Sequence, residues 1–160
     1  MKRQKGFSLI ELLIVVAIIL IIAAIAIPNL LRSRMAANES SAVGSLRTIN
    51  TAEVTYSTTY PSIGFAATLA DLGGAAPCTV AIATQACLID DVLSITRVKS
   101  GYNFSATGAN GGGPINVLYT ANATPTVVGQ SGQRAFFTDQ SGVIRYQATG
   151  APATSGDPAL

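Results

Sequence analysis

The feature that most constrains this chain is an apolar run of 21 residues, from Phe7 to Ile27, that contains one charged residue, Glu11. As a helix, the run would be about 31 Å long, because each residue adds about 1.5 Å. This length matches the hydrocarbon core of a bilayer. The sequence therefore predicts a membrane-inserted helix at residues 7–27.

Basic residues flank this run unevenly. Lys2, Arg3 and Lys5 precede it, whereas only Arg32 and Arg34 follow it closely. Because flanks rich in Lys and Arg stay in the cytoplasm, this asymmetry predicts a cytoplasmic N-terminus and an exported C-terminal part. Residues 7–160 carry seven basic and eight acidic residues. This balance gives no sign of the basic patch that nucleic-acid binding requires.

The first thirty residues read MKRQKGFSLIELLIVVAIILIIAAIAIPNL. They combine a short basic leader, Gly6 followed by Phe7, an aliphatic stretch with Glu11, and Pro28 just after the run. This combination resembles the class III leader and N-terminal helix of type IV pilins and of the related type II secretion pseudopilins. The resemblance covers residues 1–35. An ordinary secretory signal differs, because its apolar stretch is shorter and ends at a small-residue cleavage site.

The resemblance implies how the chain is processed and what it works with. Residues 1–6 would be a leader peptide, and a prepilin peptidase would cut between Gly6 and Phe7 and methylate the new amino group of Phe7. The implied partners are an inner-membrane assembly platform, minor pilins or pseudopilins, and further copies of the chain in a helical filament. Before assembly the chain would cross the inner membrane once, with a cytoplasmic N-terminus. Afterwards it would lie in an extracellular pilus or a periplasmic pseudopilus.

The position of Glu11 has a physical explanation. A carboxylate in hydrocarbon costs roughly 2.5 to 3.5 kcal/mol on insertion scales, so a partner is expected. Once cleaved, Phe7 would carry an α-amino group that is mostly cationic at neutral pH. Glu11 lies four residues further along on the same helical face, so its carboxylate can meet this amine within one chain or from a neighbouring subunit. The resemblance favours the second arrangement, which makes Phe7 and Glu11 assembly residues.

The helix is expected to continue to residue 60. Apolar residues recur there at steps of four and three, which predicts an amphipathic helix with one buried stripe. The stripe consists of Ala42, Leu46, Ile49, Ala52 and Tyr56. Polar residues between them, including Glu39 and Glu53, are expected to face outward. Pro28 lacks a backbone donor and crowds the preceding turn, which predicts a kink there.

Residues 61–91 are interpreted as the loop that connects helix and sheet, with one helical turn at TLADLGG. The two cysteines of the chain, Cys78 and Cys87, lie in this loop. A zinc site would lack ligands, because the chain has no His and no further Cys. We expect a disulfide that contributes about 2 to 3 kcal/mol by the chain-entropy model. Two free thiols are the alternative.

Residues 92–148 predict an antiparallel sheet of four or five strands. The β-rich stretches are VLSITRV, YNFSAT, INVLYTA, RAFFTD and VIRYQ. The last two are expected to form a hairpin with its turn at Asp139 to Gly142, and residues 149–160 a flexible tail. The predicted fold class is α+β: a long N-terminal helix, half hydrophobic and half amphipathic, packed on a small C-terminal antiparallel sheet, as in the pilin fold.

Several kinds of chemistry are absent from the sequence. Without any His, a Ser-His-Asp or Cys-His nucleophile system is excluded. We therefore expect no catalytic residues, no cofactor and no enzyme activity. Asp139 is a calcium candidate, because C-terminal loops of some major pseudopilins bind calcium. Its spacing matches no calcium loop, so a role in the turn is favoured and no metal site is predicted.

The sequence is compatible with three functions. The first is a structural subunit, a pilin, of a type IV pilus filament. The alternative is a major pseudopilin of a type II secretion system, and residues 1–35 do not separate the two. Against a pilin, the cysteines lie after the helix and not near the C-terminus. Against a pseudopilin, residues after Gly108 offer no convincing calcium site. A tethered binding domain that never polymerises would leave Gly6 and Glu11 unexplained.

Overall fold

The computed structural model describes residues 7–74 and 77–160, so the predicted leader peptide, residues 1–6 with Gly6, lies outside the described residues. The chain divides into two compact units, with the boundary between Arg34 and Met35. Helix α1, Leu9–Thr59, contributes to both units. The other elements are α2 (Leu69–Leu72), the π-helical turn η1 (Val92–Thr96), β1 (Val98–Lys99), β2 (Tyr102–Ala109), β3 (Leu118–Pro125), β4 (Ala135–Asp139) and β5 (Arg145–Gln147).

From Leu12 to Ile27, α1 is apolar on every side. Its large aliphatic side chains from Leu9 to Leu31 are all exposed, from 46% at Val16 to 81% at Leu9. By length and composition, this helix qualifies to cross a membrane. Pro28 lies inside the helix and leaves the carbonyl of Ala24 without its helical donor. A kink at Pro28 stays a prediction.

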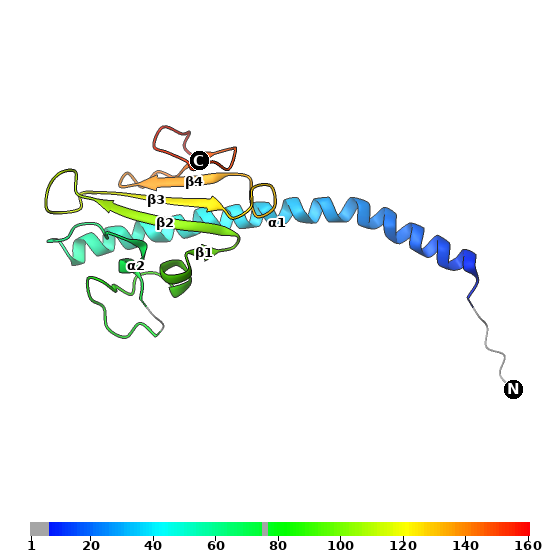
Figure 1. The fold of residues 1–160 in the computed structure, drawn as a ribbon, viewed down its shortest axis with the longest axis horizontal. Helices are drawn as coiled ribbons and strands as arrows, with labels where there is room; N and C mark the ends of the chain where they lie inside the picture. Colours follow the sequence, from blue (N-terminus) through cyan, green and yellow to red (C-terminus); the bar gives the residue numbers. More distant parts are fainter. Residues whose placement is uncertain (1–6, 75–76) are drawn as a thin grey trace. The chain divides into compact units, whose positions relative to one another are not determined.

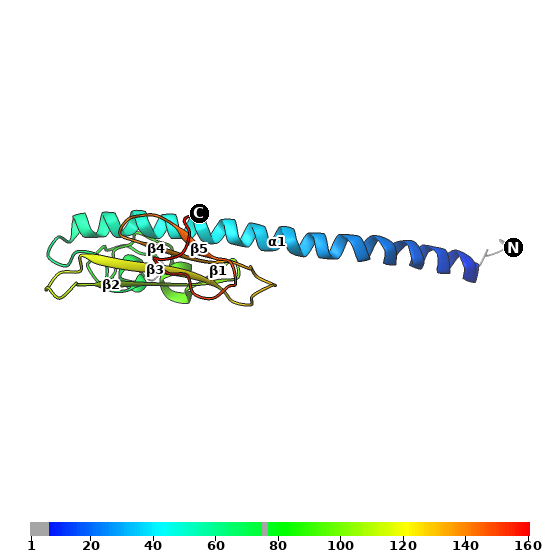
Figure 2. The same ribbon diagram turned by 90° about the horizontal axis from the view of Figure 1, so that it is seen from above.

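The predicted stripe on the second part of α1 is confirmed. Ala42, Leu46, Ile49, Ala52 and Tyr56 are all buried. They form one core with sheet residues that include Tyr102 and Phe136. Within the second unit, α1 lies along one face of the sheet as a separate layer (Figures 1 and 2). The core therefore sits between this stripe and the inward side chains of the strands.

The expectation that Glu39 and Glu53 face outward is wrong, because their exposed fractions are 8% and 0%. Oε1 of Glu39 accepts the N–H groups of Gln133 at 2.9 Å and Arg134 at 3.1 Å. Its Oε2 accepts from Nε of Arg134 at 2.8 Å. Burial acts to raise the pKa of Glu39, but these donors and the guanidinium outweigh it and lower the pKa. Helical periodicity does not predict the burial of Glu39, because the groups that donate to its carboxylate lie in a loop far along the chain.

The sheet has five antiparallel strands in the order β1-β2-β3-β4-β5, so strands adjacent in sequence are adjacent in space. The β2–β3 ladder pairs Tyr102 with Pro125 at one end and Ala109 with Leu118 at the other. The predicted hairpin is β4–β5, and in its turn the Gly142 N–H donates to the Asp139 carbonyl at 2.9 Å. The α+β fold class is confirmed.

The prediction of a strand throughout VLSITRV is wrong. Val92–Thr96 forms η1, and only Val98–Lys99 is a strand. Oδ1 of Asp90 accepts the N–H of Leu93 at 2.8 Å at the start of the turn, and Arg97 ends it in the left-handed conformation, with φ of 58°. This side-chain bond to the backbone offers the β-branched residues an alternative to a strand.

The connecting segment contains the expected helical turn, α2. Asp71 caps this turn, because its Oδ2 accepts the N–H and the hydroxyl of Thr68, both at 2.9 Å. Cys78 and Cys87 form a disulfide, with their Cα atoms 5.7 Å apart. The loop that this bond closes, residues 78–87, is called the cystine loop below.

Residues 149–160 also differ from their prediction as a flexible tail, because they are tied to the edge of the sheet. The N–H of Tyr146 donates to the carbonyl of Pro158 at 3.0 Å, and the N–H of Leu160 donates to that of Ile144 at 2.9 Å. Nη1 of Arg145 donates to the carbonyl of Asp157 at 3.0 Å. The Pro, Gly and Ser content of the segment predicts disorder, because composition carries no information about hydrogen-bond partners elsewhere in the fold. Here the edge strand β5 provides those partners.

Candidate functional site

The predicted assembly residues stand at the start of α1. Phe7 precedes the helix and is 88% exposed. Glu11 lies in the first turn of the helix, where its Oε2 accepts the N–H of Ser8 at 2.9 Å. The carboxylate therefore folds back to the residue that follows Phe7.

Ser8 is a site residue that periodicity and charge did not reveal. Ser8-Leu9-Ile10-Glu11 has the S-x-x-E pattern of a capping box, in which the Glu side chain reaches back to the N–H of the cap residue. The Ser8–Glu11 hydrogen bond is this half of the box. A carboxylate in the first turn also interacts favourably with the helix dipole. Glu11 thus has a local partner before any second subunit is present.

The surface around Glu11 is apolar. Leu9, Leu12, Leu13 and Val16 line a shallow hollow of about 280 Å³ along the first turns of α1. Aliphatic walls of this kind offer dispersion contacts and no directed hydrogen bonds. The surface can therefore accept acyl chains or another apolar helix.

The other predicted site residues lie further along the chain, Pro28 in the first unit and the rest in the second. Cys78 and Cys87 are joined to each other, and Pro28 lies within α1. Oδ1 of Asp139 accepts the N–H and the hydroxyl of Ser141, at 2.9 and 2.5 Å, so the carboxylate binds within its own turn. In residues 7–74 and 77–160, no three His, Cys, Asp or Glu side chains are grouped to hold a metal ion.

Comparisons with known proteins concern mainly the start of the chain. Residues 1–27 match a family model described as the prokaryotic N-terminal methylation motif. The type IV wide pilus major component PilA4 of Thermus thermophilus is 62% identical over 40 residues, which are 25% of this chain and 30% of that protein. The N-terminal segment is thus similar to the N-terminal segments of type IV pilins. Gly6, Phe7 and Glu11 lie within the residues that match the methylation motif.

Two further relatives also match over short stretches. The type IV major pilin protein PilA of Myxococcus xanthus is 48% identical over 54 residues, 34% of this chain and 24% of that protein. A fimbrial protein of Pseudomonas aeruginosa is 79% identical over 29 residues, 18% of this chain and 19% of that protein. The chain thus spans a third or less of these pilins. No solved structure matches it.

Proposed function

We propose that this protein is a structural subunit of a type IV pilus filament. In this proposal it is inserted in the inner membrane, cut between Gly6 and Phe7, methylated at Phe7 and polymerised through its N-terminal helix. The observation that carries the proposal is Glu11, the one charged residue among exposed aliphatic side chains, four residues after Phe7. The pilus names of the relatives support the same function.

The chemistry of Glu11 explains why assembly would follow cleavage. The Ser8 N–H satisfies part of the hydrogen-bonding capacity of Glu11 but brings no positive charge. A buried carboxylate without a counter-charge is strongly destabilising. Cleavage would create a cationic amine at Phe7. Two helices would then be held at the stagger that places the amine of one beside Glu11 of the other.

The apolar surface gives the assembly its driving force. In the inner membrane, acyl chains would cover the exposed side chains from Leu9 to Leu31. When a subunit leaves the lipid, copies of the same surface on other subunits would take their place. Contacts between unlike faces of successive subunits do not close and therefore propagate as a helical filament.

A major pseudopilin of a type II secretion system is the second candidate. It would use the same processing and the same N-terminal pairing. The disposition of Asp139 favours the pilin, because one oxygen of this calcium candidate is already engaged by Ser141 of its own turn. An enzyme is not proposed, since the relatives are named as pilus and fimbrial components.

The first test is mass spectrometry of filaments sheared from the cell surface. A pilin would appear as a chain that begins at methylated Phe7 and is lighter by two hydrogens for the Cys78–Cys87 disulfide. The same processed chain found only in the cell envelope would favour the pseudopilin. A chain that still begins at Met1 would contradict both.

The second test separates the charge of Glu11 from its capping role. Glu11→Gln keeps an oxygen that can accept the Ser8 N–H but removes the charge, whereas Glu11→Ala removes both. We expect both variants to lose filaments while remaining in the membrane fraction after alkaline extraction. Ser8→Ala is the matched control, because it retains the backbone N–H that donates to Glu11 and removes only the Ser8 hydroxyl. Normal filaments from Glu11→Gln would rule out charge pairing.

A further inference from the structure

Glu53 is an acidic residue of α1 that is buried without a counter-charge among the described residues. Its exposed fraction is 0%. Oε2 accepts the N–H of Ala66 at 2.9 Å, while Oε1 is buried with no hydrogen-bond partner among the described residues. An ionised carboxylate in such a place is costly, because burial removes the water that would solvate the charge.

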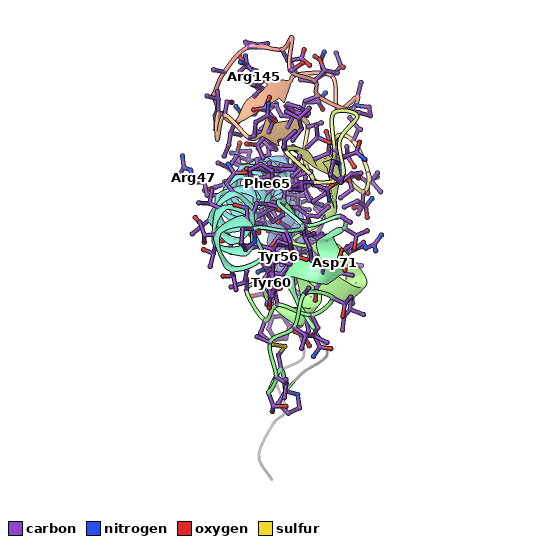
Figure 3. The ribbon with its side chains drawn as sticks, turned by 90° about the vertical axis from the view of Figure 1, so that its left-hand side faces the viewer. Arg47, Tyr56, Tyr60, Phe65, Asp71 and Arg145 are labelled. Atoms are coloured by element: carbon purple, nitrogen blue, oxygen red, sulfur yellow. A yellow bond between two sulfur atoms is a disulfide. The ribbon has the colours of Figure 1, made fainter. Side chains whose placement is uncertain are left out.

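The groups around Glu53 do not supply a positive charge. Asp71 of α2 is close enough for its negative charge to add to burial in raising the pKa of Glu53. The charge of Glu53 in turn adds to burial in raising the pKa of the Tyr56 phenol on α1 and of the Tyr119 phenol on β3. Figure 3 labels Asp71, Tyr56 and Tyr60, and the Asp71 charge acts on the Tyr56 phenol. The salt bridges found in the described residues, Lys99–Asp90 and Arg134–Glu39, do not involve Glu53. Burial, with Asp71 adding to it, raises the pKa of Glu53 to about 7, although the Ala66 hydrogen bond acts in the opposite direction.

The segment that Glu53 contacts holds the cystine loop in place. This segment is residues 64–73, and Ala66, which donates to Glu53, is itself buried. Further along, the carbonyl of Asp71 accepts the N–H of Ala86 at 2.8 Å, and that of Leu72 accepts the N–H of Leu88 at 2.7 Å. The hydroxyl of Tyr56, one turn beyond Glu53, donates to the carbonyl of Ala83 at 2.6 Å. Neighbouring side chains on one face of α1 therefore hold both the segment and the loop.

We propose that Glu53 is a proton-binding site that controls how firmly residues 64–73, and the cystine loop bonded to them, are held against α1. When Glu53 is protonated, the buried side chain is neutral and the segment stays closed. When Glu53 is ionised, its uncompensated charge favours an open state in which water reaches the carboxylate. The proposal goes beyond filament formation and does not depend on it.

The direction of the pH effect follows from proton linkage. The closed state keeps its proton up to about pH 7, whereas an open, solvated Glu53 loses it near the ordinary value of 4.5. Opening therefore releases a proton between these values. The equilibrium constant for opening should rise by nearly tenfold for each pH unit in this interval and level off above it.

Glu39 provides a matched control on the same helix. It is also buried, but it is paired with Arg134 and accepts two backbone N–H groups. Its pKa is lowered, so it stays ionised throughout the interval in which Glu53 titrates. Glu39→Gln should therefore leave the pH dependence at Ala66 unchanged.

The experiment uses the full chain in detergent micelles with ¹³C-labelled glutamate carboxyls. Glu11, Glu39 and Glu53 are the glutamates of the sequence, so three signals can be assigned with single Gln variants. We expect the Glu53 signal to titrate near pH 7. Exchange of the Ala66 amide is then measured in the wild type and in Glu53→Gln at each pH. Dividing the wild-type exchange rate by the rate of Glu53→Gln at the same pH cancels the chemical pH dependence of exchange. This ratio should rise from pH 5 to pH 7.

A second variant keeps the test decisive if Glu53→Gln does not fold. Asp71→Asn leaves Glu53 in place but removes the charge of the same sign, so the Glu53 midpoint should move toward lower pH. A Glu53 midpoint near 4.5 would overturn the proposal. So would a midpoint near 7 combined with an Ala66 exchange ratio that does not change with pH, because protonation would then not control the segment.

Discussion

Two buried glutamates of α1 show how the groups that face a residue decide its chemistry. Glu39 is surrounded by N–H donors and a guanidinium, and its pKa is lowered. Glu53 has one backbone donor and faces Asp71, and its pKa is raised to about 7. Both have the same covalent structure and lie on the same helix. The opposite directions follow from what the loops bring to each carboxylate.

Replacing Glu39 should destabilise the second unit at neutral pH. Glu39→Gln loses charge-assisted hydrogen bonds and leaves Arg134 without its partner, so the free energy of unfolding should fall by about 1.5 to 3 kcal/mol. The measurement is urea unfolding of the full chain in detergent, followed by near-UV circular dichroism. A variant as stable as the wild type at pH 7 would show that the Glu39 contacts make no net contribution to the free energy of unfolding.

The same residue should give the wild type an acid-sensitive stability. Because folding lowers the pKa of Glu39 from 4.5, its contribution is present above pH 4.5 and is lost as the pH falls through the lower folded value. We expect the difference in unfolding free energy between wild type and Glu39→Gln to shrink below pH 4.5. A difference that stays constant down to pH 3 would argue against an ionised Glu39.

At the scale of elements, the connection from α1 to the loop depends on one glycine. Gly64 has φ of +81°, and a Cβ placed there would lie 2.1 Å from the carbonyl oxygen of Asn116. That carbonyl also accepts the N–H of Phe65 at 2.9 Å. The chain therefore needs at this point both a left-handed backbone and the absence of a side chain.

Gly64→Ala should lower the unfolding free energy by about 2 to 4 kcal/mol, because strain and a backbone clash add. Gly112→Ala is the matched control: Gly112 has φ of +98° but has open space around its Cβ position. That variant should lose only about 1 to 2 kcal/mol, from strain alone. Urea unfolding measures both changes. Equal losses would show that the contact with Asn116 is unimportant.

The disulfide acts at the same scale, on one loop. Replacing both Cys78 and Cys87 by Ser should lower the unfolding free energy by about 2 to 3 kcal/mol according to the chain-entropy model. The helical signal in far-UV circular dichroism should remain, because the disulfide lies outside α1. Loss of that signal in the double variant would mean that the loop is required for folding of the helix.

At the scale of the whole molecule, each exposed edge or face needs a cover. The aliphatic side chains from Leu9 to Leu31 are exposed in the single chain, and the proposed function assigns their covering to lipid and then to other subunits. The β5 edge of the sheet is covered within the chain by residues 158–160. Uncovered strand edges invite pairing with other chains.

Ending the chain after Ala148 should therefore expose the β5 edge. We expect the shortened chain in detergent to self-associate at concentrations where the full chain does not, as measured by analytical ultracentrifugation. A variant with Asp157→Asn, which keeps the backbone contacts of Pro158 and Leu160, is the control. If the shortened chain associates no more than the full one, residues 149–160 do not protect the edge.

Features that depend on neighbouring residues along the chain could be predicted from the sequence. The apolar helix of membrane-spanning length follows from continuous apolarity. Helical spacing places Glu11 four residues after Phe7, and their pairing stays a prediction. The buried stripe from Ala42 to Tyr56 and the β4–β5 hairpin follow from local periodicity and turn residues, and the structure has both. These signals are strong because each is repeated within a few residues.

The sequence by itself thus determined the long apolar helix, the N-terminal methylation motif and the α+β class, because apolarity, spacing and turn chemistry act over short distances. Only the tertiary structure decided that Glu39 and Glu53 are buried, since their partners Arg134 and Ala66 come from other segments. It likewise decided that Val92–Thr96 turns as η1 and that residues 158–160 join β5. In each case the deciding hydrogen bond or packing contact joins groups whose meeting depends on the completed fold.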